Sequence, residues 1–241
     1  MTARRLSPIL DGIDLVVFDK DGTLIDFHAM WGTWARELGR RLEASVRRPV
    51  AADVYAAIGF DPSRGRVAAG GPLAIGTMAE IESTIATVLR RWCPSVAAAR
   101  RAVAEAWFVP DPMSSAVPLT DLPALFAHLR DGGRRIAVAT TDDRAPTDAT
   151  LRHLGIRAHV AAMVCGDDGF ALKPAPDAIL ALCQALQTTP DRVAVVGDSP
   201  ADMAMGKAAG AGLVIAVRTG IGRDADLTEA DLIVDSVAAL R

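Results

Sequence analysis

Residues 15–24 read LVVFDKDGTL, four apolar residues followed by a polar turn that contains two aspartates and a glycine. The apolar run is short and continuous, which is typical of a strand buried on both faces of a parallel sheet. Asp19 and Asp21 stand directly after this run, two positions apart. They are therefore expected at the carboxyl end of the strand, and they are the first candidates for a functional site.

Similar apolar runs recur along the chain and alternate with helical patterns. The runs cover residues 136–139, 160–164, 193–196, 213–217 and 232–234. One helical pattern spans residues 122–129, and three more are opened by Pro146, Pro176 and Pro200, since proline is favoured in the first turn of a helix. The alternation predicts an α/β fold: a Rossmann-like, doubly wound and mostly parallel sheet with helices on both faces.

Residues 27–117 interrupt this alternation with apolar residues at helical spacing only. All four tryptophans lie in this segment, and we expect them to form its core. The residues from Thr77 to Glu80 have the pattern of a capping box at the start of a helix. We predict an all-helical insert of about four helices at residues 27–117, with residues 1–26 and 118–241 forming the α/β domain.

Composition excludes several functional classes. The chain has 241 residues, of which 51% are hydrophobic and 23% charged, and its formal net charge is -3, so nucleic acid is not an expected partner. No apolar run approaches the ~20 residues that span a bilayer, and residues 1–10 do not form a signal peptide. The three cysteines lack a CxxC spacing, which favours neither a disulfide framework nor a zinc site and fits a reducing cytoplasm.

Chemically active side chains follow four of the predicted elements. After Asp19 and Asp21 come Thr140 at the end of one strand, Lys173 before Pro174, and the segment GDSPAD, which carries Asp198 and Asp202. Ligands of open parallel sheets bind at the carboxyl ends of the strands. Four such groups in this order, on alternating strands and helices, form a far more specific signal than an Asp-Gly turn alone.

This set of motifs resembles the haloacid dehalogenase superfamily, in its phosphoglycolate phosphatase-like branch with a helical cap. The resemblance extends from residue 12 to the C-terminus, with an insert of cap length at residues 27–117. It implies that Asp19 is a nucleophile that forms an aspartyl-phosphate. It also implies that Asp21 protonates the leaving oxygen and then activates the hydrolytic water.

The resemblance further implies a Mg²⁺ site, whose oxygen ligands would offset the repulsion between the carboxylates and the substrate. The implied ligands are Asp19, the backbone carbonyl of Asp21 and Asp198, with Asp202 nearby. Thr140 and the main chain at Thr141 would bind phosphate oxygens, and Lys173 would offset the charge of Asp19. Thr141 stands where the family often has Asn or Ser, and the acidic Asp142 follows where a non-acidic residue is common.

The expected activity is the Mg²⁺-dependent hydrolysis of a small phosphorylated metabolite, such as phosphoglycolate, a sugar phosphate or a nucleotide, by a monomer or homodimer. A phosphomutase of the β-phosphoglucomutase type stays open, because its core residues would be the same. An inactive binding module with the same fold is a further alternative. Asp21 argues against a dehalogenase, and the absence of Lys from residues 27–117 argues against a Schiff-base mechanism.

Three residues of the insert are additional candidates for substrate contact. His28 follows the first motif closely, while Arg64 and Arg66 lie in a Gly-rich connection and could bind an anion, although a solvated loop is the favoured explanation of both. Lys20 is expected to point away from the two aspartates, with no role for its side chain. Asp142 and Asp143 are expected to be turn and capping residues.

Overall fold

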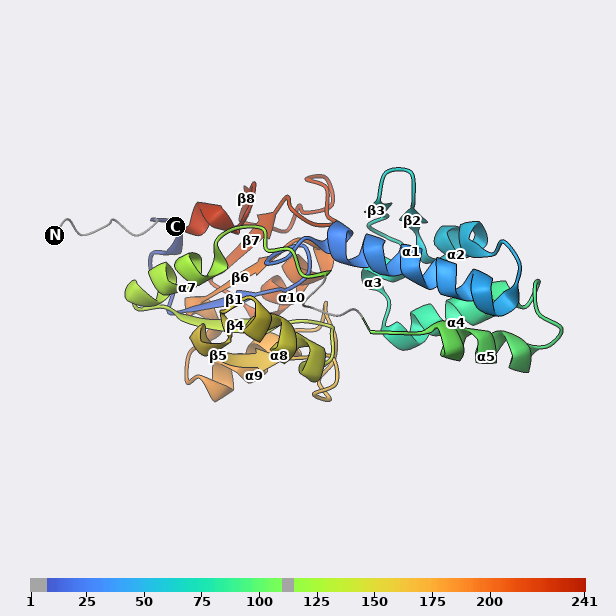
Figure 1. The fold of residues 1–241 in the computed structure, drawn as a ribbon. Coiled ribbons are helices and arrows are strands. Elements are labelled where there is room, and N and C mark those ends of the chain that lie inside the picture. Colours follow the sequence, from blue (N-terminus) through green and yellow to red (C-terminus); the bar gives the residue numbers. More distant parts are fainter. Residues whose placement is uncertain (1–7, 110–114) are drawn as a thin grey trace. The chain divides into compact units, whose positions relative to one another are not determined.

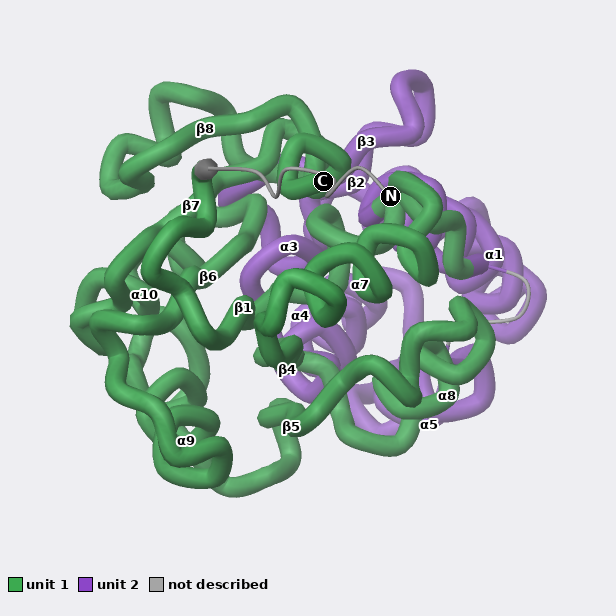
Figure 2. The backbone as a smooth tube through the Cα atoms, turned by 90° about the vertical axis from the view of Figure 1, so that its left-hand side faces the viewer, with its two compact units in different colours: residues 1–26, 116–241 green, residues 27–115 purple. Residues whose placement is uncertain are grey.

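The computed structural model describes residues 8–109 and 115–241 (Figure 1). The chain divides into two compact units, which Figure 2 distinguishes by colour. Unit 1 combines residues 1–26 with residues 116–241, and unit 2 comprises residues 27–115. Among the described residues, none of the helices combines the length and the apolar character that crossing a bilayer requires.

Unit 1 is built on a six-stranded sheet in which all paired strands are parallel. The strand order is β5–β4–β1–β6–β7–β8, with β1 (Leu15–Phe18), β4 (Arg135–Ala139), β5 (Val160–Val164), β6 (Val193–Gly197), β7 (Leu213–Val217) and β8 (Leu232–Val234). The predicted Rossmann-like α/β fold is thereby confirmed. Because β1 pairs with β4 on one side and β6 on the other, the residues that follow these three strands emerge at one edge of the sheet.

Helices cover both faces of this sheet, as the complete burial of all four residues of β1 requires. Val16 and Phe18 pack in one apolar cluster with α7 (Leu122–Asp131) and α8 (Arg144–His153), whereas Leu15 and Val17 pack with α9 (Asp177–Ala185) and α10 (Pro200–Ala209). Figure 2 shows the two pairs of helices on opposite sides of the strands. Single 3₁₀ turns complete the unit: η1 (Pro8–Leu10), η2 (Arg157–His159), η3 (Pro190–Arg192) and η4 (Val237–Leu240).

Two details of these helices differ from the sequence predictions. Helix α8 begins at Arg144, so Pro146 lies inside its first turn instead of opening it. This is compatible with proline, because the first N–H groups of a helix have no partner within the helix. In the helical pattern that Pro176 opens, Ile179, Leu180 and Cys183 form the predicted apolar side, but Leu180 of α9 is 45% exposed.

Unit 2 is mainly helical and also contains a short hairpin. Its elements are α1 (Phe27–Val46), α2 (Ala51–Ile58), β2 (Phe60–Asp61), β3 (Arg66–Val67), α3 (Pro72–Ile75), α4 (Met78–Leu89) and α5 (Val96–Ala106). The capping box expected at Thr77 is present, since its side chain accepts from the Glu80 N–H while Glu80 accepts from the Thr77 N–H. The antiparallel pair β2–β3 falls within the segment that we expected to be a Gly-rich connection between helices.

Three of the four tryptophans pack in the core of unit 2, but the fourth does not. The indole of Trp34 is 2% exposed, stacks edge-on against Trp31 and Trp107, and donates to the Phe108 carbonyl at 2.9 Å. Trp92 is 37% exposed and donates instead to a carboxylate oxygen of Asp53 at 2.9 Å. The expectation that all four tryptophans form the core was therefore wrong at Trp92, which follows the end of α4.

Candidate functional site

Three carboxylates and one ammonium group meet at the carboxyl edge of the sheet in unit 1. Asp19 follows β1, while Asp198 and Asp202 follow β6, the neighbour of β1. Lys173 Nζ lies 2.5 Å from Asp19 Oδ1 and 2.6 Å from Asp202 Oδ1. The parallel register therefore joins residues from three distant parts of the sequence into one cluster, which is largely buried.

Asp198 is held in place by the segment that follows β7. Its Oδ2 atom accepts from the backbone N–H of Ile221 at 2.8 Å, and its Oδ1 atom lies 3.5 Å from the Thr23 hydroxyl. Gly22, with φ +87°, and Gly220 both press against this carboxylate: a Cβ atom at either position would lie 2.5 Å or less from Asp198 Oδ2. Both glycines thus permit the backbone to approach Asp198 closely.

The side chain of Asp202 caps the start of α10 and also belongs to the carboxylate cluster. Its Oδ2 atom accepts from the N–H and the hydroxyl of Ser199, and the Ser199 hydroxyl accepts from the Asp202 N–H, which completes a capping box. Its Oδ1 atom contacts Lys173. Both carboxylate oxygens therefore already have protein partners, an arrangement that suits a residue that positions Lys173.

The cluster contains more negative than positive charge. Burial raises the pKa of Asp19 to about 7, with Lys173 opposing this shift and the charges of Asp202 and Asp21 adding to it. Burial also raises the pKa of Asp198 well above its ordinary value, and the neighbouring charges of Asp19 and Asp202 act in the same direction. One lysine does not offset three carboxylates, so an additional cation would stabilise their ionised forms.

The donor atoms of the cluster suit Mg²⁺. Asp19, Asp198 and Asp202 each offer a carboxylate oxygen, and these three atoms lie within 4.8 Å of one another. Hard oxygen ligands are what Mg²⁺ selects, whereas zinc favours histidine and cysteine. Three of the residues that the sequence analysis assigned to a metal, Asp19, Asp198 and Asp202, therefore have side-chain oxygens that fit this ion, whereas the ligand role of the Asp21 carbonyl stays a prediction.

Thr140 follows β4, the other neighbour of β1. Its hydroxyl oxygen accepts from the Asp142 N–H at 3.2 Å, which leaves the hydroxyl proton available for a ligand. Thr140 and Thr141 line one small pocket together with Lys173. The structure thus brings these three predicted phosphate-binding residues to one place, next to the carboxylate of Asp19 that Lys173 contacts.

Asp21 lies in the turn after β1, and the side chain of Lys20 contacts it. Lys20 Nζ is 2.5 Å from Asp21 Oδ1 and 2.9 Å from Asp142 Oδ2. The expectation that Lys20 points away from both aspartates was wrong. Asp142 lies in the turn after β4, as expected, and also pairs with Lys20. The pairing has a structural cause: Lys20 follows β1 and Asp142 follows β4, which are adjacent strands.

The remaining predicted residues belong to unit 2. The ring nitrogen Nδ1 of His28 accepts from the Val67 N–H at 3.3 Å, so His28 is anchored to the β2–β3 hairpin. Arg64 is exposed and lies 3.9 Å from Asp61, and Arg66 lines the same open pocket as Arg64. None of the three is part of the carboxylate cluster, all of whose members belong to unit 1.

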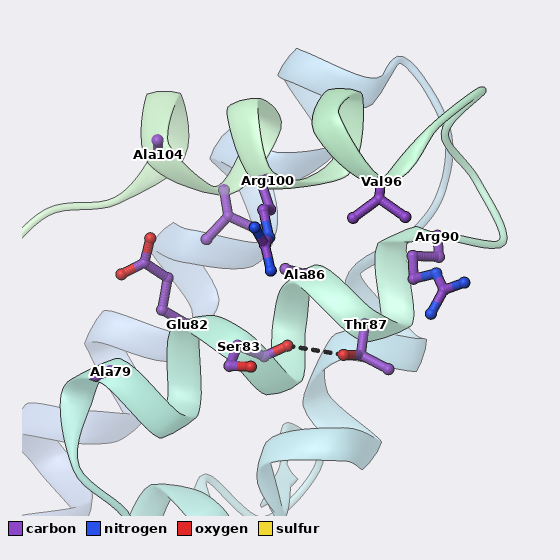
Figure 3. A pocket seen from close by; sticks show the side chains of 10 residues that line it. Ala79, Glu82, Ser83, Ala86, Thr87, Arg90, Val96, Arg100 and Ala104 are labelled. Atoms are coloured by element: carbon purple, nitrogen blue, oxygen red, sulfur yellow. Dashed lines mark hydrogen bonds between the residues drawn. The ribbon is translucent and has the colours of Figure 1, made fainter.

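Unit 2 also contains a groove of about 440 Å³ between α4 and α5 (Figure 3). The side chain of Arg100 extends from α5 into this groove, and Arg90 lies at the end of α4. Glu82 is the one carboxylate among the residues that line it. The groove therefore lacks the paired carboxylates and the lysine found in unit 1, and the candidate active site is the cluster around Asp19.

Sequence reasoning did not identify the residues that support the cluster from the segment after β7. The Ile221 N–H binds Asp198, Gly220 packs on it, and the Thr219 hydroxyl donates to the Gly22 carbonyl at 2.6 Å. A signal was present in the sequence, because TGIG at residues 219–222 follows a predicted strand and its glycines permit close backbone approach.

Comparison with known proteins points to one family of hydrolases, both by sequence and by fold. A family model described as haloacid dehalogenase-like hydrolase matches residues 13–210. Among solved structures, a HAD-superfamily hydrolase of subfamily IA from Geobacter sulfurreducens superimposes with a TM-score of 0.66, at 18% identity, over 96% of each chain. At that identity the likeness shows the fold.

Two curated relatives are phosphatases by name. The phosphoglycolate phosphatase of Rhodospirillum rubrum is 36% identical over 110 residues, and the chain spans only about half of that relative's length, 46%. The validoxylamine A 7'-phosphate phosphatase of Streptomyces hygroscopicus subsp. limoneus is 26% identical over 229 residues, which is 94% of this chain and 95% of that protein.

Proposed function

Because this chain belongs to the haloacid dehalogenase-like hydrolase family, we propose that it is a Mg²⁺-dependent phosphatase of small phosphorylated metabolites. The observation that carries the proposal is the meeting of Asp19, Asp198 and Asp202 within 4.8 Å at the edge of the sheet, with Lys173 paired to Asp19. The two curated relatives, named as phosphatases of small phosphomonoesters, support the same class of substrate.

Asp19 is the proposed nucleophile. Its carboxylate lies at the carboxyl end of β1, and Lys173 holds its Oδ1 atom at 2.5 Å, which leaves Oδ2 to attack phosphorus. Attack forms the bond between Asp19 and phosphorus, breaks the bond between phosphorus and the ester oxygen, and leaves an aspartyl-phosphate. A Mg²⁺ ion held by Asp19 and Asp198 would neutralise charge on the phosphoryl group and on the neighbouring carboxylates.

Asp21 is the proposed acid and base. In its protonated form it gives a proton to the departing ester oxygen, so the alcohol leaves as a neutral molecule. The resulting carboxylate then takes a proton from water, whose oxygen attacks the phosphorus of the aspartyl-phosphate. This second step releases inorganic phosphate and returns Asp19 to its starting form.

Thr140 and Lys173 orient the phosphoryl group in this proposal. The Thr140 hydroxyl can donate to a phosphate oxygen, and the ammonium of Lys173 offsets negative charge on Asp19 and on the substrate. The carboxylates of Asp19 and Asp202, which contact Lys173, raise its pKa even though burial acts against its charge, so Lys173 stays charged. It thus acts as a fixed positive charge rather than as a proton donor.

Unit 2 has the proposed role of a cap that selects the substrate, with His28, Arg64 and Arg66 as candidate contacts. The alternative of a phosphomutase would use the same carboxylates but return the phosphoryl group to a sugar. The proposal also includes a cytoplasmic location, which the three free cysteine thiols support.

The test is a panel of phosphomonoesters, including phosphoglycolate, sugar phosphates, nucleoside monophosphates and p-nitrophenyl phosphate, with Mg²⁺ and with a chelator. We expect release of inorganic phosphate that requires Mg²⁺. Asp19→Asn should lower kcat by ~10³-fold or more while the circular dichroism spectrum is unchanged. Isomerisation of a sugar phosphate with little phosphate release would identify a mutase, and Mg²⁺ binding without any turnover would identify a binding module.

A further inference from the structure

Gly166, in the turn that follows β5, lies directly against the loop that carries Thr140 and Thr141. A Cβ atom at position 166 would overlap the carbonyl oxygen of Thr141 and lie 2.9 Å from its carbonyl carbon. The Gly166 N–H also donates to the Asp142 carbonyl at 2.8 Å. Gly166 does not have a positive φ, so its backbone conformation does not require glycine, whereas the lack of space beside it does.

The peptide group between Thr141 and Asp142 connects this contact to the side chain of Thr140. Its carbonyl oxygen packs on Gly166, and its N–H donates to the Thr140 hydroxyl oxygen at 3.2 Å. Because the hydroxyl oxygen accepts this hydrogen bond, its proton is left for another acceptor. A movement of the peptide group would weaken the hydrogen bond and allow the hydroxyl to rotate.

The turn that contains Gly166 is itself tied to the start of α8, so it does not move aside freely. Asp168 Oδ2 accepts from the Cys165 N–H at 2.7 Å, and the Asp168 carboxylate pairs with the guanidinium of Arg144. Asp167 Oδ1 accepts from the Arg144 N–H at 2.8 Å. The loops after the adjacent strands β4 and β5 are therefore held together on either side of the Gly166 contact.

We propose that Gly166 is a positioning residue that keeps the Thr140 hydroxyl in the orientation that binds a phosphate oxygen. The inference rests on the proposed function, because that function assigns Thr140 to the phosphoryl group. Gly166 does not touch the substrate in this scheme; it fixes the peptide group after Thr141, and that peptide group orients the hydroxyl. The alternative is that Gly166 only permits two loops to pack closely and contributes to stability alone.

Gly166→Ala tests the inference, and Gly212→Ala is its matched control. Gly212 precedes β7, also lacks a positive φ, and donates its N–H to the Pro190 carbonyl at 3.0 Å. A Cβ atom at position 212 would overlap the carbonyl oxygen of Asp191 and lie 2.8 Å from its carbonyl carbon. The control therefore creates the same kind of overlap at the amino ends of β6 and β7, the edge of the sheet opposite the carboxylate cluster.

The probe is inorganic phosphate, whose dissociation constant is measured by isothermal titration calorimetry with Mg²⁺ present. We expect Gly166→Ala to raise this constant by ~10-fold or more, because a hydrogen bond to a charged oxygen is lost. Gly212→Ala should lower Tm to a similar extent but leave the constant within ~2-fold of wild type. Equal constants in the two variants, or no phosphate binding by the wild type, would overturn the inference. Turnover of phosphomonoesters, which tests the proposed function, does not enter this comparison.

A double-mutant cycle with Thr140→Val separates positioning of the hydroxyl from general damage to the site. Valine has nearly the shape of threonine but no hydroxyl, so Thr140→Val alone should weaken phosphate binding. If Gly166 acts through that hydroxyl, adding Gly166→Ala to Thr140→Val should weaken binding by no more than ~2-fold further. Losses that multiply in the double variant would contradict the inference.

Asp168→Ala decides the question if Gly166→Ala does not fold. It removes the carboxylate that holds the turn of Gly166, and it should raise the phosphate dissociation constant severalfold. Its control is Asp231→Ala, since Asp231 likewise accepts from a backbone N–H, that of Val214, and pairs with a cation, Lys207. Asp231→Ala should leave the constant unchanged, and the same result for Asp168→Ala would count against the inference.

Discussion

At the scale of single residues, the space around Asp198 is the tightest constraint on the site. A Cβ atom at position 220 would lie 1.8 Å from Asp198 Oδ2, and its neighbours would have to move. We expect Gly220→Ala to lower the free energy of unfolding by ~1–3 kcal/mol, as overpacking usually does. We also expect Mg²⁺ affinity to fall, because the displaced carboxylate is a proposed ligand. Urea unfolding and magnesium titration measure the two effects.

Gly70→Ala is the control for this substitution. A Cβ atom at position 70 would meet nothing within 4 Å, and Gly70 does not have a positive φ. It should leave both stability and Mg²⁺ affinity close to wild type. Equal behaviour of the two variants would show that the space around Asp198 is less constrained than the structure indicates.

Some residues of the site can be predicted from local sequence pattern, whereas others depend on contacts between distant parts of the chain. Asp19, Asp21 and Asp198 follow apolar runs directly, so local pattern alone places them at strand ends. The contact between Lys20 and Asp142 depends on which strands are neighbours, and a single sequence does not state that order. The contact between the Ile221 N–H and Asp198 was equally hard to predict from the sequence, because almost any residue type supplies a backbone N–H.

At the scale of elements, the start of α10 joins helix stability to the site. The Ser199 hydroxyl caps α10 and also donates to Asp202, which holds Lys173. We expect Ser199→Ala to cost ~1 kcal/mol of stability. We further expect it to lower kcat severalfold, because Asp202 loses a partner that fixes its orientation. Thermal unfolding and steady-state kinetics on one phosphomonoester would measure both.

A second capping box among the described residues, at Thr77 and Glu80 before α4, offers a matched comparison. Thr77→Ala removes the same kind of cap and should cost a similar ~1 kcal/mol. Its kcat should stay near wild type, since Thr77 has no contact with the carboxylate cluster among the hydrogen bonds of the described residues. A parallel loss of kcat in both variants would mean that Ser199 acts through stability alone.

Elements differ in how readily the sequence reveals them. The six strands of the sheet are continuous apolar runs, and their predicted and observed bounds agree to within one residue. Strands β2 and β3 have two residues each, too few to show any alternation of polar and apolar side chains. The start of α8 was misplaced because Pro146 is acceptable at more than one position of a first turn.

At the scale of the whole molecule, the excess negative charge of the cluster makes folding stability depend on the metal. A ligand that binds only the folded state stabilises it by about 2.7 kcal/mol at 100 times its dissociation constant. We expect Mg²⁺ to raise the Tm of the wild type by ~5–10 °C at that concentration. Calorimetry with Mg²⁺ and with a chelator would measure the shift.

Asp198→Asn should remove most of this response. Without metal, the variant should be at least as stable as the wild type, because one of three crowded carboxylates has become neutral. Its side-chain oxygen can still accept from the Ile221 N–H, so the local hydrogen bond is kept. An undiminished rise in Tm with Mg²⁺ would place the metal away from Asp198.

The position of β1 in the sheet has a consequence for biosynthesis. This strand leaves the ribosome before both of its neighbours, because β4 is made after all of unit 2 and β6 is made later still. The nascent strand must therefore wait, with its apolar residues 15–18 unpaired, while unit 2 can fold upon itself. A chaperone that binds short apolar segments would encounter the region around LVVF before the edge of the sheet that carries Asp19 and Asp198 exists.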